Sequence, residues 1–170
     1  MSRPSATEYA PFYQTYVNYT SGKDYEVLVK QYNERLIESW GAIPLERIND
    51  SYGPDKWTIK QMFQHVIDTE RIFAYRALAI ARRDTTSLPS FEENDYAKNA
   101  TAANRNWKDM LIEWRMIRQS TNMLFASFSE EDMKQKGIVG GNTISVNALG
   151  FIIFGHALHH LHILKERYDI

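Results

Sequence analysis

Apolar residues spaced three and four positions apart recur in four long stretches of the chain, a pattern typical of helices that bury one face. We expect these helices at residues 24–40, 58–83, 101–127 and 144–168. A tyrosine-rich segment at 7–20 precedes them, and it is predicted to form a short N-terminal helix or an ordered lead-in outside the main bundle. No stretch alternates apolar and polar residues over a useful length, so no strand is predicted.

Capping residues mark the ends of several helices. Asp24 can cap the first long helix, and Thr58 with Gln61 has the spacing of a capping box at the start of the second. The loop that contains Pro89 is long enough to cover one end of a bundle, and the glycine-rich stretch 136–143 connects to the last helix. These boundaries predict helices joined by both short and long connections, and they leave the topology open.

Four amphipathic helices in 170 residues imply an all-α fold, a four-helix bundle in one domain over residues 1–170. The formal charge is −1, with 20 Lys and Arg against 21 Asp and Glu, which argues against a nucleic-acid partner. There is no cysteine, so no disulfide, thiolate ligand or cysteine nucleophile is available. We expect a cytoplasmic protein without a membrane partner, because the sequence lacks a signal-peptide pattern and a long apolar run.

Two histidines of the last helix form the strongest chemical signal. His156 and His160 are separated by about 40° around a helix and lie on the strip that carries Leu149 and Ile153. Imidazoles four residues apart are close enough to bind one ion. His159 lies about 60° to one side of His156, and His162 about 120° away, so both are poorer candidates for the same site.

A third histidine faces inward from the second long helix. His65 shares the apolar strip with Met62, Val66 and Thr69, so it can meet His156 and His160 inside the bundle. Three neutral nitrogen ligands leave a coordination position free, as in catalytic zinc sites, and they suit Zn, Ni, Fe or Cu. The alternative interpretation is a set of core histidines that are satisfied by hydrogen bonds.

Polar residues near His65 are candidates for a catalytic role. Asp68 and Glu70 follow it by about one turn, and a carboxylate there could orient a ligating imidazole or accept a proton. A surface ion-pair face is the alternative for Glu70. Arg76, on the strip of His65, either holds an anionic substrate group or pairs with a core carboxylate such as Glu113.

The segments KWTIKQMFQHVIDTERIFAYRALAIARRD and FGHALHHLHILKERY resemble the DinB-like superfamily, and the resemblance extends over nearly the whole chain. It implies an up-down-down-up bundle that binds a divalent metal, most often nickel or zinc, with iron as a further candidate. By position, the ligands that the resemblance implies are His65, His156 and His160. Characterised members use the metal with a low-molecular-weight thiol, as in bacillithiol transferases and mycothiol-dependent maleylpyruvate isomerase.

The resemblance therefore implies a metal-dependent enzyme that transfers such a thiol to a small electrophilic substrate. A metal-dependent hydrolase with Asp68 or Glu70 as the base is one alternative, and a non-catalytic metal-binding or stress protein is another. Homodimers are common in the family. The last helix is also apolar on its far side, at Phe151, Phe154 and Leu158, which a partner subunit or the N-terminal tyrosine-rich segment would have to cover.

Overall fold

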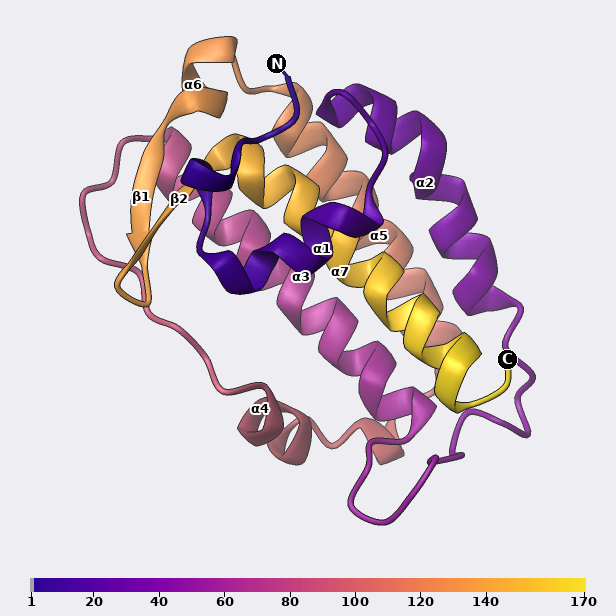
Figure 1. The fold of residues 1–170 in the computed structure, drawn as a ribbon. Coiled ribbons are helices and arrows are strands. Elements are labelled where there is room, and N and C mark those ends of the chain that lie inside the picture. The colour runs from indigo at the N-terminus through magenta and orange to yellow at the C-terminus, as the bar shows by residue number, and fades with distance from the viewer. Residues whose placement is uncertain (1) are drawn as a thin grey trace.

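Four long helices form the body of the protein in a computed structural model, which describes residues 2–170 (Figure 1). They are α2 (Tyr25–Gly41), α3 (Ile59–Ala81), α5 (Trp107–Ala126) and α7 (Val146–Arg167). Helix α7 packs against α2 and α3, and α5 packs against the same two helices from the other side. The predicted four-helix bundle is confirmed.

The connectivity of the bundle is up-down-down-up. Helices α3 and α5 run in the same direction, because the long connection between them returns the chain to the end of the bundle where α3 began (Figure 1). This connection contains α4 (Glu93–Asn99) and a 3-10 turn at Ala102–Asn104. Helices α2 and α7 run the opposite way. The crossover also brings Ser90, Phe91 and Glu93 to the site described below, where residues of α3 line the same cavity.

The helix starts follow the predicted caps with one correction. Asp24 accepts a hydrogen bond from the Val27 amide, and Thr58 and Gln61 form the expected capping box. The third long helix does not begin near Thr101, which has a left-handed φ of 49°. It begins after Asn106, whose side-chain oxygen accepts hydrogen bonds from the backbone amides of Lys108 and Asp109. A polar N-cap therefore decides where this helix starts.

A β-hairpin replaces the predicted glycine-rich connection. It consists of β1 (Lys136–Val139) and β2 (Asn142–Ser145), which pair antiparallel. Gly140 and Gly141 form its turn with φ of 54° and 80°, values that favour glycine. Leu88 of the crossover extends the pairing, since its amide donates to the Ile138 carbonyl at 2.9 Å. The expectation of no strand was wrong because strands of four residues are too short to show alternation.

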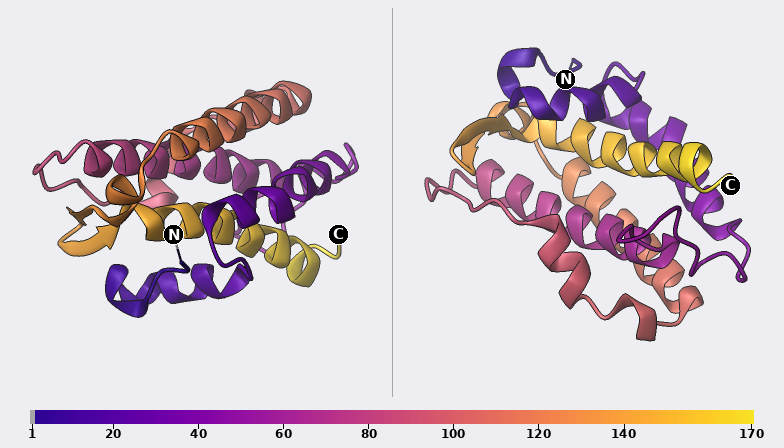
Figure 2. Two further views of the ribbon diagram at one scale, coloured as in Figure 1. Left: turned by 90° about the horizontal axis from the view of Figure 1, so that it is seen from above. Right: turned by 60° about the horizontal axis from the view of Figure 1, so that its bottom comes forward.

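The N-terminal segment lies on the outer side of α7 (Figure 2). It consists of two 3-10 turns and α1 (Gln14–Tyr19). The two helices approach so closely at Gly155 that a Cβ atom there would overlap the Tyr16 carbonyl group. Glycine is therefore required at this contact, which holds the tyrosine-rich segment next to the histidines of α7.

The far side of α7 is covered within one chain. Phe151 and Phe154 are fully buried. The Arg3 guanidinium lies over the Phe151 ring at 5.6 Å, and the Tyr25 ring of α2 packs against Phe154 with 5.5 Å between centroids. The N-terminal segment and α2 thus cover Phe151 and Phe154, two of the apolar positions for which the sequence left open a partner subunit or the N-terminal segment.

Among the residues described, the helices all lack the length or the apolar character needed to cross a membrane.

Candidate functional site

Three histidine side chains meet inside the bundle, His65 from α3 and His156 and His160 from α7. Nε2 of His156 lies 2.9 Å from Nε2 of His65 and 3.1 Å from Nε2 of His160. Their potential ligand atoms all lie within 4.8 Å of one another, and each residue is at least nine-tenths buried. The three histidines therefore face the interior from α3 and α7, as their positions on the apolar strips predicted.

Burial keeps these imidazoles neutral. It lowers the pKa of His65 to about 4, and it lowers the pKa of His156 and His160 well below the ordinary value of histidine. A smaller contribution comes from the charge that neighbouring histidines would carry if protonated. At neutral pH each ring consequently has one nitrogen lone pair available.

The three rings cannot satisfy one another by hydrogen bonding. Nε2 of His156 faces two other nitrogens, yet a neutral imidazole nitrogen is either one donor or one acceptor. The Thr69 hydroxyl lies 3.4 Å from Nδ1 of His65. Nδ1 of His160 is buried and has no hydrogen-bond partner among residues 2–170. Buried polar atoms without partners cost about 1–3 kcal/mol each. We therefore expect a further group to bind to this cluster.

The spacing of the nitrogens fits a divalent ion. Two nitrogens that are each about 2.0–2.1 Å from one ion lie about 3.3 Å apart at a tetrahedral angle and about 2.9 Å apart at a right angle. The two separations around His156 fall within or close to this range. The residues present therefore match the donor set, and the two separations around His156 match the spacing that such an ion requires.

A cavity of about 500 Å³ opens onto the histidines. Its volume is in the range of small-molecule sites. The Trp57 ring lies 4.9 Å from that of His65, and the Tyr16 ring meets His156 edge-on at 5.3 Å. Six aromatic side chains line the cavity, Phe12, Tyr13, Tyr16, Trp57, Phe73 and Phe91. Sequence reasoning missed their role, although the density of tyrosine before α2 was the available signal.

Neither carboxylate candidate lies in this cavity. Asp68 is half-buried, accepts a hydrogen bond from Gln64 at 2.9 Å, and has a pKa raised by burial. Glu70 is buried and accepts hydrogen bonds from Trp114 and Arg118, both at 3.1 Å. Around α3 the two carboxylates are rotated from His65 by about 60° and 140°, which directs them to other surfaces of the helix. Glu70 is also not part of a surface ion-pair face, because it pairs with Arg118 in the interior.

Arg76 does line the cavity. It is only 4% exposed, and one of its terminal nitrogens donates to the Pro89 carbonyl at 2.7 Å. The expected pair with Glu113 is absent, because Glu113 pairs with Arg71 and Arg105 at the surface. The one carboxylate among the described lining residues belongs to Glu93, which is exposed at the rim.

The two remaining histidines differ from each other. His159 lines the cavity between the rings of Tyr16 and Tyr19, and burial lowers its pKa. His162 is exposed and lies 3.0 Å from a carboxylate oxygen of Glu166, one turn along α7. His162 therefore provides a control position on the same helix.

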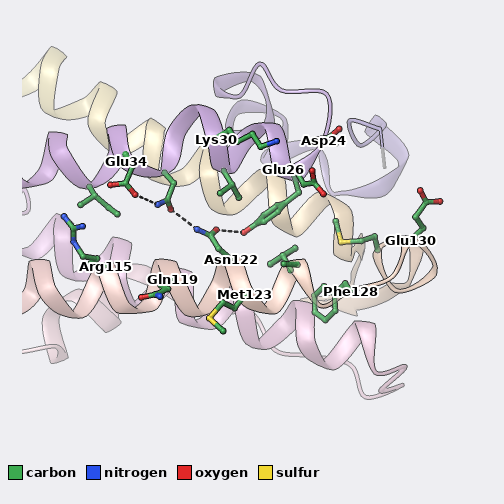
Figure 3. A pocket seen from close by; sticks show the side chains of 17 residues that line it. Asp24, Glu26, Lys30, Glu34, Arg115, Gln119, Asn122, Met123, Phe128 and Glu130 are labelled. Carbon is green, nitrogen blue, oxygen red and sulfur yellow. Dashed lines mark hydrogen bonds between the residues drawn. The ribbon is translucent and has the colours of Figure 1, made fainter.

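A larger hollow, of about 860 Å³, lies between α2 and α5. Four of its polar side chains form a chain of hydrogen bonds, seen as dashed lines in Figure 3. The Tyr25 hydroxyl donates to Asn122, the Asn122 amide donates to Asn33, and the Asn33 amide donates to Glu34, each at 2.9 Å. Each of these groups has a complementary hydrogen-bond donor or acceptor, whereas Nδ1 of His160 has none among residues 2–170.

Comparisons with known proteins agree with the fold and the family resemblance. The model of the DinB superfamily matches residues 28–164. The structure is similar to that of YfiT from Bacillus subtilis, described as a probable metal-dependent hydrolase with an unusual four-helix bundle topology. The TM-score is 0.67 at 14% sequence identity, over 98% of this chain and 93% of that one. No curated protein matches the sequence.

Proposed function

The chain belongs to the DinB superfamily, and from this premise we propose that it is a divalent-metal-binding protein that acts as an enzyme on a small molecule. The ligands in this proposal are His65, His156 and His160. The observation that supports it most strongly is the approach of three neutral, buried Nε2 atoms at the wall of an aromatic cavity.

The donor set suits Zn, Ni, Fe or Cu, and the family resemblance favours nickel or zinc among them, with iron as a further candidate. A bound ion of this kind supplies Lewis-acid chemistry and lowers the pKa of a water or thiol in its remaining position. The protein's part is to hold three imidazoles neutral, to orient His65 through Thr69, and to surround the open side with aromatic rings that exclude water.

Elemental analysis of the purified protein tests the metal. We expect close to one equivalent of a divalent transition metal in the wild type and a loss of most of it in His65→Ala and His156→Ala. His162→Ala is the matched control, because it removes an exposed imidazole from the same helix. Equal metal content in all four proteins, or none in the wild type after incubation with nickel and zinc, would refute the proposal.

For the reaction, we propose transfer of a low-molecular-weight thiol to an electrophile. The sequence has no cysteine, so a thiol nucleophile has to arrive with a cosubstrate. Hydrolysis is the reaction class in the description of YfiT, and the hydrolase alternative names Asp68 or Glu70 as the base. Neither carboxylate lines the cavity, and Glu93 stands at its exposed rim, so the lining gives no support to Asp68 or Glu70 as that base.

Thiol consumption with a model electrophile tests this reaction. Metal-loaded wild type with bacillithiol or glutathione is compared with His65→Ala and with Asp68→Asn. We expect a fall of at least tenfold in rate for His65→Ala and little change for Asp68→Asn. Loss of a hydrolytic activity in Asp68→Asn at unchanged metal content would favour the hydrolase instead. Full metal occupancy without turnover would assign the ion to a non-catalytic role.

A further inference from the structure

Arg76 is a buried cation without an anionic partner. Its hydrogen bond to the Pro89 carbonyl uses one terminal nitrogen. Among residues 2–170, no carboxylate lies within ion-pair distance of its guanidinium, and Glu113 pairs with other arginines. A guanidinium has five N–H donors and stays protonated. Burying such a charge is costly unless it is paired. Since Arg76 also lines the histidine cavity, the position of this unpaired charge points to a ligand.

We propose that Arg76 binds the carboxylate group of the substrate, and that this substrate is a small, largely apolar carboxylic acid whose other end reaches the histidines. The catalytic part of this inference rests on the function proposed above, whereas binding at Arg76 does not require the metal.

The charge of the cavity favours a carboxylate over a phosphate. Arg76 is the only lysine or arginine among the described residues that line the cavity, so it neutralises one negative charge. A phosphate dianion would bring a second charge towards Glu93 at the rim. A planar guanidinium also matches the two oxygens of a carboxylate. The Tyr13 hydroxyl lies close enough for the guanidinium to oppose the rise in the Tyr13 pKa that burial causes.

Aromatic rings hold the guanidinium in place. Cζ of Arg76 lies 5.5 Å from the centre of the Phe73 ring and 5.6 Å from that of Phe91. Contacts with two rings and the Pro89 carbonyl fix the side chain before any ligand arrives, which reduces the entropy lost on binding. The same rings offer apolar surface to the body of a carboxylic acid.

Arg76 and the three histidines line the same cavity. Arg76 is rotated from His65 by about 20° around α3, so both point to the same side of the helix. Phe73 lies between the two groups, with its ring centre 6.1 Å from that of His156 and 5.5 Å from Cζ of Arg76. An acid with a short apolar body can therefore have its carboxylate at Arg76 and its reactive end at the histidines.

The test compares phenylacetate with its neutral analogue phenylacetamide. Binding to metal-free protein is measured by isothermal titration calorimetry and ligand-observed NMR, so that a metal cannot hold the carboxylate. We expect the acid to bind at least tenfold more tightly than the amide, and this preference to disappear in Arg76→Gln. Arg76→Lys, which keeps the charge, should retain part of it. Arg71→Gln removes an exposed arginine from the same helix and should change nothing.

Equal binding of acid and amide, absence of acid binding at millimolar concentration, or an undiminished preference in a folded Arg76→Gln would overturn the inference. If Arg76→Gln does not fold, Arg76→Lys and the acid-to-amide comparison in the wild type still decide the question. Metal uptake by the wild type, measured separately after incubation with nickel and zinc, separates the two proposals. Carboxylate preference without any metal uptake would overturn the proposed function alone, and metal uptake without the preference would overturn this inference alone.

Discussion

Helix α3 carries a buried polar cluster on each of two faces, and the two clusters differ in whether the groups that meet there carry opposite charges or are of the same kind. One face presents His65 to the histidines of α7. The other presents Glu70 to α5, where Arg118 and Trp114 both donate hydrogen bonds to its carboxylate. The two residues are five positions apart, about 140° around the helix. Proximity in sequence therefore says little about a shared site.

The chain itself supplies the counter-charge of Glu70. Arg118 is fully buried, pairs with Glu70 at 3.1 Å, and stacks on the Phe154 ring with Cζ 4.2 Å from its centre. The opposite charges offset one another and both carboxylate oxygens accept a hydrogen bond, although Nε of Arg118 has no partner among residues 2–170. In the histidine cluster, by contrast, three groups of the same kind face one another. A buried pair of opposite charges supports a structural role, whereas a group of like side chains that lack complementary partners supports a binding site.

The largest expected effect comes from breaking the buried pair of Glu70 and Arg118. Arg118→Met leaves the Glu70 carboxylate buried without its counter-charge, and loss of one partner of a buried pair costs about 3–5 kcal/mol. We expect the free energy of unfolding, measured by urea denaturation, to fall by about this amount. Metal content per folded molecule should be unchanged.

An exposed ion pair provides the control for this prediction. Arg71→Met breaks the pair with Glu113, whose side chains are 49% and 23% exposed. Exposed pairs contribute about 0.2–1 kcal/mol. If Arg118→Met were no more destabilising than Arg71→Met, the internal pair would not be the structural element that its burial suggests.

The difference between the clusters also explains which features could be predicted from the sequence. Helical periodicity alone placed His65, His156 and His160 on inward strips, and side-chain caps located the starts of α2 and α3. Periodicity gives the face on which a residue lies but not its partner on another helix. The pair of Glu70 with Arg118 was therefore missed, and Arg76 was assigned to Glu113 as one alternative although it contacts Pro89.

Contacts that depend on the path of the connecting segments could not be predicted from the sequence either. The crossover brings Phe91 and Glu93 to the cavity, and the N-terminal segment brings Tyr13 and Tyr16. Their placement depends on the length of the crossover and on the close approach at Gly155, which no local pattern specifies. The inward faces of the site were thus predictable, and its aromatic walls were not.

A smaller effect should follow from removing the one hydrogen-bond partner that the described chain offers to the histidine cluster. Thr69→Val keeps the shape of the side chain but removes the hydroxyl 3.4 Å from Nδ1 of His65. Groups that orient a ligating imidazole typically change metal affinity by 10–100-fold when lost. Because this contact is long, we expect the low end, about tenfold, in a competition assay with a chromogenic chelator. Unchanged affinity would mean that Thr69 does not orient the ring.

The smallest effect on stability is expected in the histidine cluster, where no buried pair of opposite charges is broken. His160→Leu removes one of the three imidazoles, with its unpartnered Nδ1, and leaves an apolar side chain of similar size in a buried position. Replacing a poorly satisfied polar group by an apolar one of similar shape is close to neutral. We therefore expect the free energy of unfolding of metal-free protein to change by less than about 1 kcal/mol, or to rise.

The same substitution should abolish stabilisation by metal. A ligand that binds only the folded state raises its stability by mass action, so zinc or nickel should raise the melting temperature of the wild type and leave that of His160→Leu unchanged. If the free energy of unfolding of metal-free His160→Leu fell by about 3 kcal/mol, as expected for Arg118→Met, this interpretation would be contradicted. The histidines would then be core residues that stabilise the fold as Glu70 and Arg118 do, and the contrast between the two faces of α3 would disappear.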